Sequence, residues 1–182
     1  MKKTIKECIF TVLTKQYKEK KMPEIVNPAD SLVNFQHALL HGLIQLSSCV
    51  IHPEMKVLFD NAEGTPRITY AFVDEKVVRG VAIYVPVDSV DGKPCFAVGY
   101  AVADEYKNQG VGTQLLQSSI EEMQAGFRAT FPDFYIEAIV GVDNIPSNKL
   151  AQKIISRTSN PGSDAYSGKP INQYLKYIKT TQ

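Results

Sequence analysis

The stretch that decides the fold runs from Val98 to Thr113 and reads VGYAVADEYKNQGVGT. It predicts an apolar strand up to Val102, a short polar turn, and a helix whose first turn contains Gly110 and Gly112. A helix N-terminus presents unpaired amide donors and a partial positive charge, and glycines let a phosphate approach the backbone closely. The stretch is therefore typical of an anion-binding turn, with a pyrophosphate as its natural ligand.

Two common phosphate-binding motifs do not fit this stretch. The dinucleotide fingerprint needs a third glycine three residues after the second, and Leu115 stands there instead. The P-loop needs Gly-Lys followed by Ser or Thr, whereas Gly112 is followed directly by Thr113. Two glycines alone also suit an ordinary turn between a strand and a helix. Other parts of the sequence are therefore needed to distinguish an anion-binding turn from an ordinary one.

The sequence before this stretch predicts helical and then extended structure. Residues 5–13 favour a strand because most of their apolar side chains are β-branched or aromatic, but their period is poor and a helix stays open as the alternative. Apolar residues recur at helical spacing from residue 31 to about residue 50, which predicts one helix or two helices broken at Gly42. Short extended runs separated by turn residues then predict an antiparallel meander of strands at 55–59, 67–73, 76–87 and 95–102.

The sequence after this stretch alternates between helix and strand. Residues 110–126 and about 147–156 carry helical periodicity, and a loop rich in Ser, Gly and Pro follows at 157–170. The nearly continuous apolar run at 134–141 predicts a strand buried on both faces, and residues 171–178 predict the last strand. The whole order is that of a mixed α/β fold around one sheet.

Composition narrows the classes of function. A chain of 182 residues suits a single domain over residues 1–182, and its 20 Lys plus Arg against 19 Asp plus Glu give a net charge of +1. This balance disfavours a nucleic-acid-binding protein, and no apolar run approaches the roughly 18 residues that a membrane helix needs. Three scattered cysteines do not make a disulfide framework, so we expect a reducing cytoplasm.

No metal site is expected. His37 and His41 stand four residues apart on a predicted helix and could share a metal with His52 or Cys49, but they lack the intervening Glu of the zinc-protease arrangement. Ordinary packing is the favoured interpretation of both histidines. Cys95 is likewise interpreted as a buried thiol, because no histidine lies near it in the sequence.

Two segments of the chain together resemble a known family. Residues 107–112, KNQGVG, are similar to a signature of Arg or Gln, two residues, Gly, one residue and Gly or Ala, with Lys107 as a conservative departure. Further along, residues 140–150, VGVDNIPSNKL, are similar to a Val-x-x-x-Asn-x-x-Ser-x-x-Leu segment. The chain therefore resembles the GNAT superfamily of acyl-CoA-dependent N-acyltransferases, most strongly over residues 75–155.

The resemblance implies a fold and a co-substrate. It implies a mixed, mostly antiparallel central sheet with helices on both faces and a parallel, splayed strand pair at an acetyl-CoA site. Backbone amides of residues 109–113 would hold the pyrophosphate, main-chain groups near Val102 would pair with the pantetheine and polarise the acyl carbonyl, and Asn144 would hydrogen-bond the pantetheine. Ser147 would cap the second helix. The residues implied to bind acetyl-CoA are Val102, Lys107, Asn108, Gln109, Gly110, Val111, Gly112, Thr113 and Asn144.

Three departures from the family pattern bear on the mechanism. Ala151 stands where many members have a Tyr that protonates the leaving thiolate, and Ile155-Ser156 stands in place of a closing Gly-Phe. Residues 95–102 also lack the carboxylate that members frequently carry on this strand. A Tyr-assisted step through position 151 is therefore absent, and we expect the C-terminal region to be built differently.

The candidates for catalysis follow from the reaction itself. Direct attack of an amine on a thioester needs a neutral amine, a polarised carbonyl and an acceptor for one proton. Glu137 is the one carboxylate within the strand predicted at 134–141, which makes it the first candidate for the base, although a solvated strand position would also account for it. Tyr100 and Tyr135 are further candidates and would otherwise be core aromatics.

Three functions are open at this point. The expected one is an N-acetyltransferase that moves the acetyl group of acetyl-CoA to a primary amine of a small molecule or a peptide. The second is a CoA-binding regulatory module without catalytic activity. A loss of catalysis would explain why the Tyr and the strand carboxylate are both absent. The third is an unrelated nucleotide-binding α/β domain, which would bind ATP or NAD more tightly than acetyl-CoA. The sequence identifies neither the acceptor nor the oligomeric state, and a homodimer is among the options.

Overall fold

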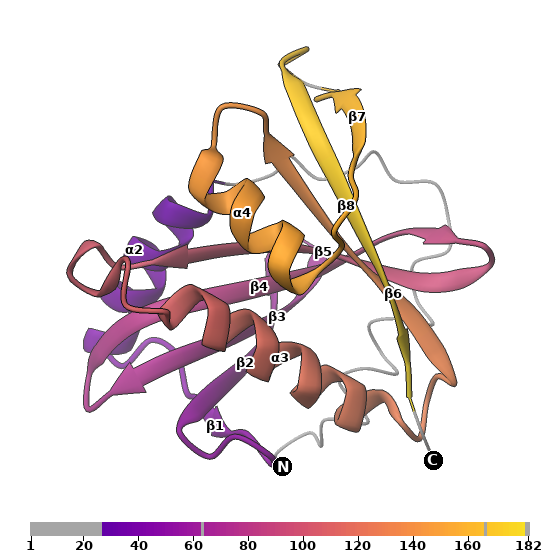
Figure 1. Ribbon diagram of the computed structural model, residues 1–182. Helices are drawn as coiled ribbons and strands as arrows, with labels where there is room; N and C mark the ends of the chain where they lie inside the picture. The colour runs from indigo at the N-terminus through magenta and orange to yellow at the C-terminus, as the bar shows by residue number, and fades with distance from the viewer. Residues whose placement is uncertain (1–26, 63, 166, 181–182) are drawn as a thin grey trace.

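The described part of the chain forms one eight-stranded sheet with helices on both faces (Figure 1). The computed structural model describes residues 27–62, 64–165 and 167–180, so the strand expected at 5–13 lies outside the described residues. The strands lie in the order β1-β2-β3-β4-β5-β6-β8-β7. In chain order the elements are α2 (Pro28–Leu40), β1 (Ser47–Ser48), β2 (Met55–Ala62), β3 (Thr65–Asp74), β4 (Val77–Val90), β5 (Lys93–Val102), η1 (Asp104–Tyr106), α3 (Val111–Phe127), β6 (Asp133–Gly141), α4 (Ile145–Ile154), β7 (Asn160–Ser163) and β8 (Pro170–Lys179).

The strands β2 to β5 form the antiparallel meander that the sequence predicts. β4 and β5 pair as far as Val102, which lies opposite Gly80. The turn between them is Asp91-Gly92, whose φ angles are 51° and 72°. Asp-Gly is a preferred sequence for a tight hairpin turn with positive φ at both central positions, so this turn helps to fix the register of β5.

The parallel pair β5 and β6 is splayed. The two strands share only three residue pairs, from Cys95 opposite Tyr135 to Ala97 opposite Glu137. Beyond these pairs β5 stays with β4 and β6 stays with β8 along the rest of their lengths, so the two halves of the sheet separate (Figure 1). We call this divergence of residues 98–102 from residues 138–141 the splay, and it confirms the implied parallel, splayed pair.

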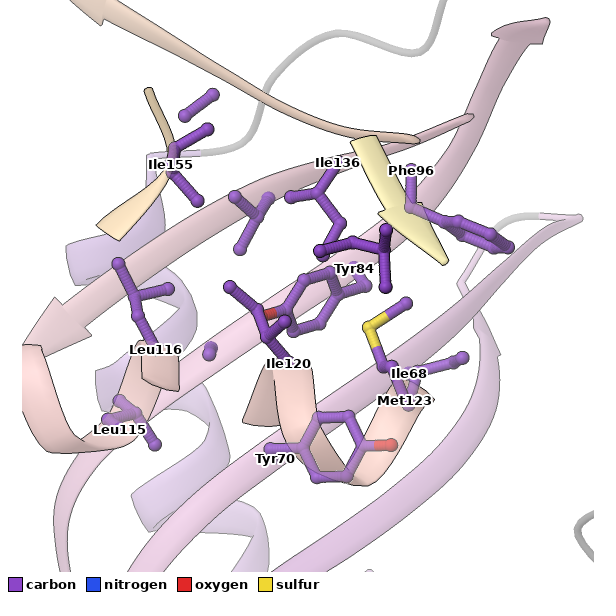
Figure 2. Close-up of a cluster of buried hydrophobic side chains, with 14 of the residues drawn as sticks. Ile68, Tyr70, Tyr84, Phe96, Leu115, Leu116, Ile120, Met123, Ile136 and Ile155 are labelled. Atoms are coloured by element: carbon purple, nitrogen blue, oxygen red, sulfur yellow. The ribbon is translucent and has the colours of Figure 1, made fainter. Parts of the chain in front are cut away.

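Helices α3 and α4 cover one face of the sheet, and α2 covers the other (Figure 1). On the α3/α4 face the Tyr84 hydroxyl is hydrogen-bonded to the Ser119 hydroxyl at 2.7 Å, and both side chains are buried. On the opposite face Leu32 and Phe35 of α2 pack with residues of β3 and β4. The α3/α4 core includes the side chains that Figure 2 labels, which are Ile68, Tyr70, Tyr84, Phe96, Leu115, Leu116, Ile120, Met123, Ile136 and Ile155.

The helix expected at 31–50 is shorter than predicted. α2 ends at Leu40, where the Leu43 amide donates to the Ala38 carbonyl at 2.9 Å and Gly42 has a φ of 67°. This is a Schellman-type helix end, for which a left-handed glycine is the usual residue. The break expected at Gly42 is therefore present, but no second helix follows, and Ser47–Ser48 pair with β2 instead. No helix in the described part of the chain is long and apolar enough to cross a bilayer.

Two further expectations were wrong in detail. β6 is not buried on both faces, because Phe134, Ile136, Ala138 and Val140 are buried while the residues between them are only half-buried. The loop expected at 157–170 contains the short strand β7, which pairs with β8 at the edge of the sheet. The apolar composition of β6 concealed its alternation, since half-buried positions also accept Tyr and Ile.

A buried carboxylate fixes α3 against the loop before β2. Glu122, which is 7% exposed, accepts hydrogen bonds from the amides of Val50, Ile51 and His52 at 3.2, 2.6 and 2.7 Å. The neighbouring Glu121 reaches the His52 ring nitrogen Nε2 at 2.7 Å from a more exposed position. Because α3 begins next to the splay, this anchoring at its other half contributes to holding that region in place.

We predict that Glu122→Ala lowers the free energy of unfolding by about 3 kcal/mol, because three amides lose a charged acceptor. The matched control is Glu121→Ala, which removes a partly exposed hydrogen bond to the His52 ring and should cost about 0–1 kcal/mol. Urea unfolding at constant pH measures both. Equal losses for the two variants would show that the triple hydrogen bond is not what secures the loop.

Candidate functional site

The turn from β5 into α3 leaves the helix N-terminus free. Gly110 is the N-cap residue of α3, has a φ of 82°, and offers no side chain to cap the helix. The first turn of α3 carries no acidic residue. The leading amides of the helix, including those of Val111, Gly112 and Thr113, have no carbonyl partner inside the helix. Together with the helix dipole, they form a site suited to an anion.

Side chains within the turn brace its backbone. The Gln109 side-chain amide donates to the Glu105 carbonyl at 2.7 Å, and the Lys107 ammonium pairs with the Asp104 carboxylate. The hydrogen bond from Lys107 holds the pKa of Asp104 below its usual value. Asn108 has a φ of 60°, in the left-handed region. Lys107, Asn108 and Gln109 are all exposed, and the Gln109 side chain is engaged within the turn itself.

The two glycines of the motif have different roles. A Cβ atom at Gly110 would meet nothing within 4 Å, so this position needs glycine for its positive φ and leaves open space above the backbone. A Cβ atom at Gly112 would lie 3.2 Å from Leu150 of α4 and 3.4 Å from Val102 of β5. Gly112 therefore lets α3 approach α4 and β5, and only Gly110 borders free space.

The β6 side of the splay ends in a capped helix. Asn144 is the N-cap of α4, and its Oδ1 accepts a hydrogen bond from the Ser147 amide at 3.2 Å. The expectation that Ser147 caps this helix was wrong, because the helix begins at Ile145 and Ser147 lies inside its first turn. The exposed Asn144 side chain keeps its NH₂ group without a partner among the described residues, so it can still donate to a ligand.

The two catalytic candidates lie on opposite faces of the sheet. Ile136 and Ala138 point into the core beneath α3 and α4, so Glu137 between them faces the α2 side, where the Gln173 side chain donates to it. Glu137 is half-buried and lies opposite Ala97, in the last pair before the splay. The structure thus gives the expected base a position beside the splay, although in a less buried strand than predicted.

Tyr100 lies within the splay on the α3/α4 side. Its side chain packs against the core there, and its hydroxyl donates to the Ser147 carbonyl at 3.4 Å, which links β5 to the first turn of α4. Burial raises the pKa of Tyr100, so its hydroxyl stays protonated near neutral pH. The structure therefore separates Tyr100 from Glu137, and the two cannot act as one acid–base pair on the same atom.

The other candidates lie away from the splay. The Tyr135 hydroxyl donates to Asp91 at 3.0 Å, at the far end of β5 and β6. Cys95 is 2% exposed, and burial raises its pKa to about 12, which keeps the thiol protonated. His37 and His41 stack at 4.0 Å on the exposed side of α2. Across residues 27–62, 64–165 and 167–180, no group of three His, Cys, Asp or Glu is arranged to hold a metal.

Two features of α4 were missed or misread in the sequence. Ala151 is fully buried in the α3/α4 core, whereas an open position for the family's Tyr was expected there. Asn148 is also buried, at 7% exposure, and it makes hydrogen bonds to backbone and side chains on three elements. The available signal for Asn148 was its spacing of three from Ala151, which places a polar amide on the apolar face of a helix.

Comparison with known proteins identifies the family. A family profile described as the acetyltransferase (GNAT) family matches residues 39–155, which is more than half of the chain. The chain therefore belongs to the GNAT acetyltransferase family, as the two sequence motifs predicted. No curated protein matches its sequence.

Several solved structures are similar to this chain. RimL, described as a ribosomal L7/L12 alpha-N-protein acetyltransferase in complex with coenzyme A, shares 21% identity over 63% of this chain and 64% of its own, with a TM-score of 0.49. An acetyltransferase of the GNAT family from Streptococcus pneumoniae shares 14% identity over 84% of this chain and 96% of its own, with a TM-score of 0.47. The match to RimL spans less than two thirds of that protein's length.

We predict that Ala151→Tyr destabilises the fold by about 1–3 kcal/mol, because the larger side chain has no room in the core beneath α4. It should not restore a proton donor to the splay. Gln152→Tyr, at the exposed neighbouring position of the same helix, should change the free energy of unfolding by less than about 0.5 kcal/mol. Thermal and urea unfolding of both variants test this, and a fully stable Ala151→Tyr protein would contradict the burial of Ala151.

Proposed function

We propose that this protein transfers the acetyl group of acetyl-CoA to a primary amine. The observation that carries the proposal is the splay beside the uncapped N-terminus of α3. The diverging strands leave backbone donors and acceptors of residues 98–102 without strand partners on the β6 side. Buried or half-buried main-chain groups need hydrogen-bond partners, and the amide-rich pantetheine arm can supply them.

The proposed position of acetyl-CoA follows from the two sides of the splay. The amides of residues 109–113 would hold the pyrophosphate, with Lys107 and Asn108 beside it. Main-chain groups near Val102 would pair with the pantetheine and polarise the acyl carbonyl, and the free NH₂ of Asn144 would donate to the pantetheine from the other side. This arrangement would bind acetyl-CoA mostly through backbone groups, so it requires few specific side chains around the ligand.

In the proposed reaction the amine nitrogen forms a bond to the acyl carbon, and the carbon–sulfur bond then breaks. The proton lost by the nitrogen goes to the Glu137 carboxylate, directly or through water, and the thiolate of CoA takes a proton from the Tyr100 hydroxyl, which regains one from solvent. Because Glu137 faces the α2 side, the amine would approach from that face. Tyr100 lies on the other side, within the splay, where a protonated hydroxyl suits the departing sulfur better than the attacking amine.

The acceptor is proposed only as a primary amine of a small molecule or a peptide. Release of free thiol from acetyl-CoA, measured across a panel of polyamines, amino sugars, amino acids and peptides with free N-termini, would identify its class. We place the reaction in a reducing cytoplasm, where the buried thiols of Cys49 and Cys95 would remain reduced.

A second candidate is a CoA-binding regulatory module without turnover. The identity of Ala151 favours it, because the helix offers no hydroxyl at that position to protonate the thiolate. Binding of acetyl-CoA without thiol release from any amine in the panel would select this function. Tighter binding of ATP or NAD than of acetyl-CoA would point instead to a nucleotide-binding domain and contradict both.

We predict that Gly110→Glu abolishes stabilisation by CoA, because a charged side chain would fill the open space that the pyrophosphate needs. The wild type should gain about 2.7 kcal/mol at a hundredfold excess of CoA over its dissociation constant. The matched control is Gly92→Glu, since Gly92 also has a positive φ, of 72°, and open space around it, but lies at the opposite end of β5. Thermal melts should show equal intrinsic losses and a CoA response only in the control.

We predict that Glu137→Gln lowers kcat by about 10²-fold while the dissociation constant of CoA stays within twofold, because the amine loses its proton acceptor. The acidic limb of the pH–rate profile should disappear with it. Asp133→Asn is the control, since Asp133 lies on the same face of β6 and is engaged by Tyr177 and Lys93. Superimposable pH profiles for wild type and Glu137→Gln would eliminate Glu137 as the base.

A further inference from the structure

Asn148 is a buried amide whose hydrogen-bonding groups are fully used. Its Nδ2 donates to the carbonyls of Gly141 and Asn144, both at 2.9 Å, and lies 3.5 Å from that of Val142. Its Oδ1 accepts from the Asn172 side chain and from the Tyr174 hydroxyl of β8, both at 2.8 Å. A single side chain therefore joins the end of β6, the start of α4 and β8.

The segment that Asn148 holds, residues 141–146, is exposed to solvent on the side away from Asn148. Residues 141–146 are all exposed, and they include two apolar side chains, Val142 at 37% and Ile145 at 55% exposure. The same segment carries Asn144, which caps α4 and keeps a free NH₂ group. Asn148 holds this turn on its buried side, and the opposite side is exposed to solvent. Such a turn can bind a ligand without the entropic cost of first becoming ordered.

The position of this segment sets one side of the splay. The Tyr100 hydroxyl reaches the Ser147 carbonyl at 3.4 Å, so the first turn of α4 is linked across the splay to β5. Asn148 follows Ser147 directly, and its side chain attaches that turn to the end of β6. A shift of the turn by an ångström would change both the contact with Tyr100 and the direction of the Asn144 side chain.

We propose that Asn148 is a positioning residue that preorganises the β6 side of the splay for acyl-CoA. This inference rests on the proposed function, and it assigns to Asn148 no contact with the ligand. Nδ2 holds the carbonyls of Gly141 and Asn144, and thereby fixes the backbone that carries the exposed Asn144 side chain and its free NH₂ group. Asn172 and Tyr174 fix the orientation of the Asn148 amide, because their two donors select Oδ1 as the acceptor.

The test compares variants that break different halves of the same network. Asn148→Asp keeps the shape but removes the Nδ2 donors that hold the turn. Tyr174→Phe removes one donor to Oδ1 at a fully buried position and leaves the hold on the turn intact. A purely structural role for Asn148 predicts that both variants lose stability and bind CoA alike. Asn148→Ala serves as a second variant in case a buried carboxylate prevents folding.

Calorimetry with CoA as the probe should show a dissociation constant raised at least tenfold in the Asn148 variants and changed less than threefold in Tyr174→Phe. At saturating acetyl-CoA, kcat of the Asn148 variants should stay within threefold of wild type, so the effect falls on KM. Hydrogen exchange should be faster at the Asn144 and Ser147 amides in the Asn148 variants alone.

The outcomes separate this inference from the proposed function. A wild-type protein that binds no CoA would overturn the proposed function and this inference with it. Binding by the wild type together with equal dissociation constants for the Asn148 variants and Tyr174→Phe would overturn the inference alone. A fall in kcat that matches or exceeds the rise in KM would also overturn the inference, because a residue that positions the site for binding should change KM and leave kcat nearly unchanged.

Discussion

The rest of this structure depends on where the parallel pairing of β5 and β6 stops. Three residue pairs join the two strands, and each strand then keeps only its antiparallel neighbour. The halves of the sheet remain one body because α3 packs against β3, β4 and β5 while also contacting α4, which lies on β6 and β8. Main-chain groups at the diverging edges are left facing one another without being bonded. Backbone groups that are left unpaired at the centre of a sheet need hydrogen-bond partners from outside the sheet, such as water or a ligand.

In the proposed reaction the splay would divide the chemistry of the site between two faces of the sheet. On the α3/α4 face lie the free amides at the start of α3, which favour negative charge, and a protonated Tyr100. On the α2 face lies the Glu137 carboxylate, which can take up a proton. A thioester that reaches the splay from one face would meet an amine that arrives from the other, so the order of the sheet itself would keep the anionic and basic ends of the reaction apart.

Much of the fold and part of the site could be predicted from the sequence, because their signals are local. The helical period after Gly110, the Asp91-Gly92 turn and the short motifs at 107–112 and 140–150 each depend on residues close together in the chain. The errors concern which face a residue occupies. The burial of Ala151 and the network around Asn148 depend on how α4 lies on β6 and β8, and the half-burial of Glu137 depends on the opposite face of β6 and its neighbour β8, and no short stretch encodes either placement. Ser147 was misjudged for a simpler reason, since Asn144 is also a good N-cap and precedes it.

The missing side chain at Gly110 has a consequence for how this site would diverge over evolutionary time. Recognition by bare main-chain amides depends on the path of the backbone and hardly at all on the identity of the neighbouring side chains. Substitutions at the exposed residues 107–109 would leave the main-chain donors in place, although they would remove the contacts by which Lys107 and Gln109 brace the turn. Two descendants of one ancestor could thus keep the same anion site while sharing few residues around it. The backbone path of such a site can be retained while its sequence changes, so sequence identity around it is a poor measure of whether the site is still present.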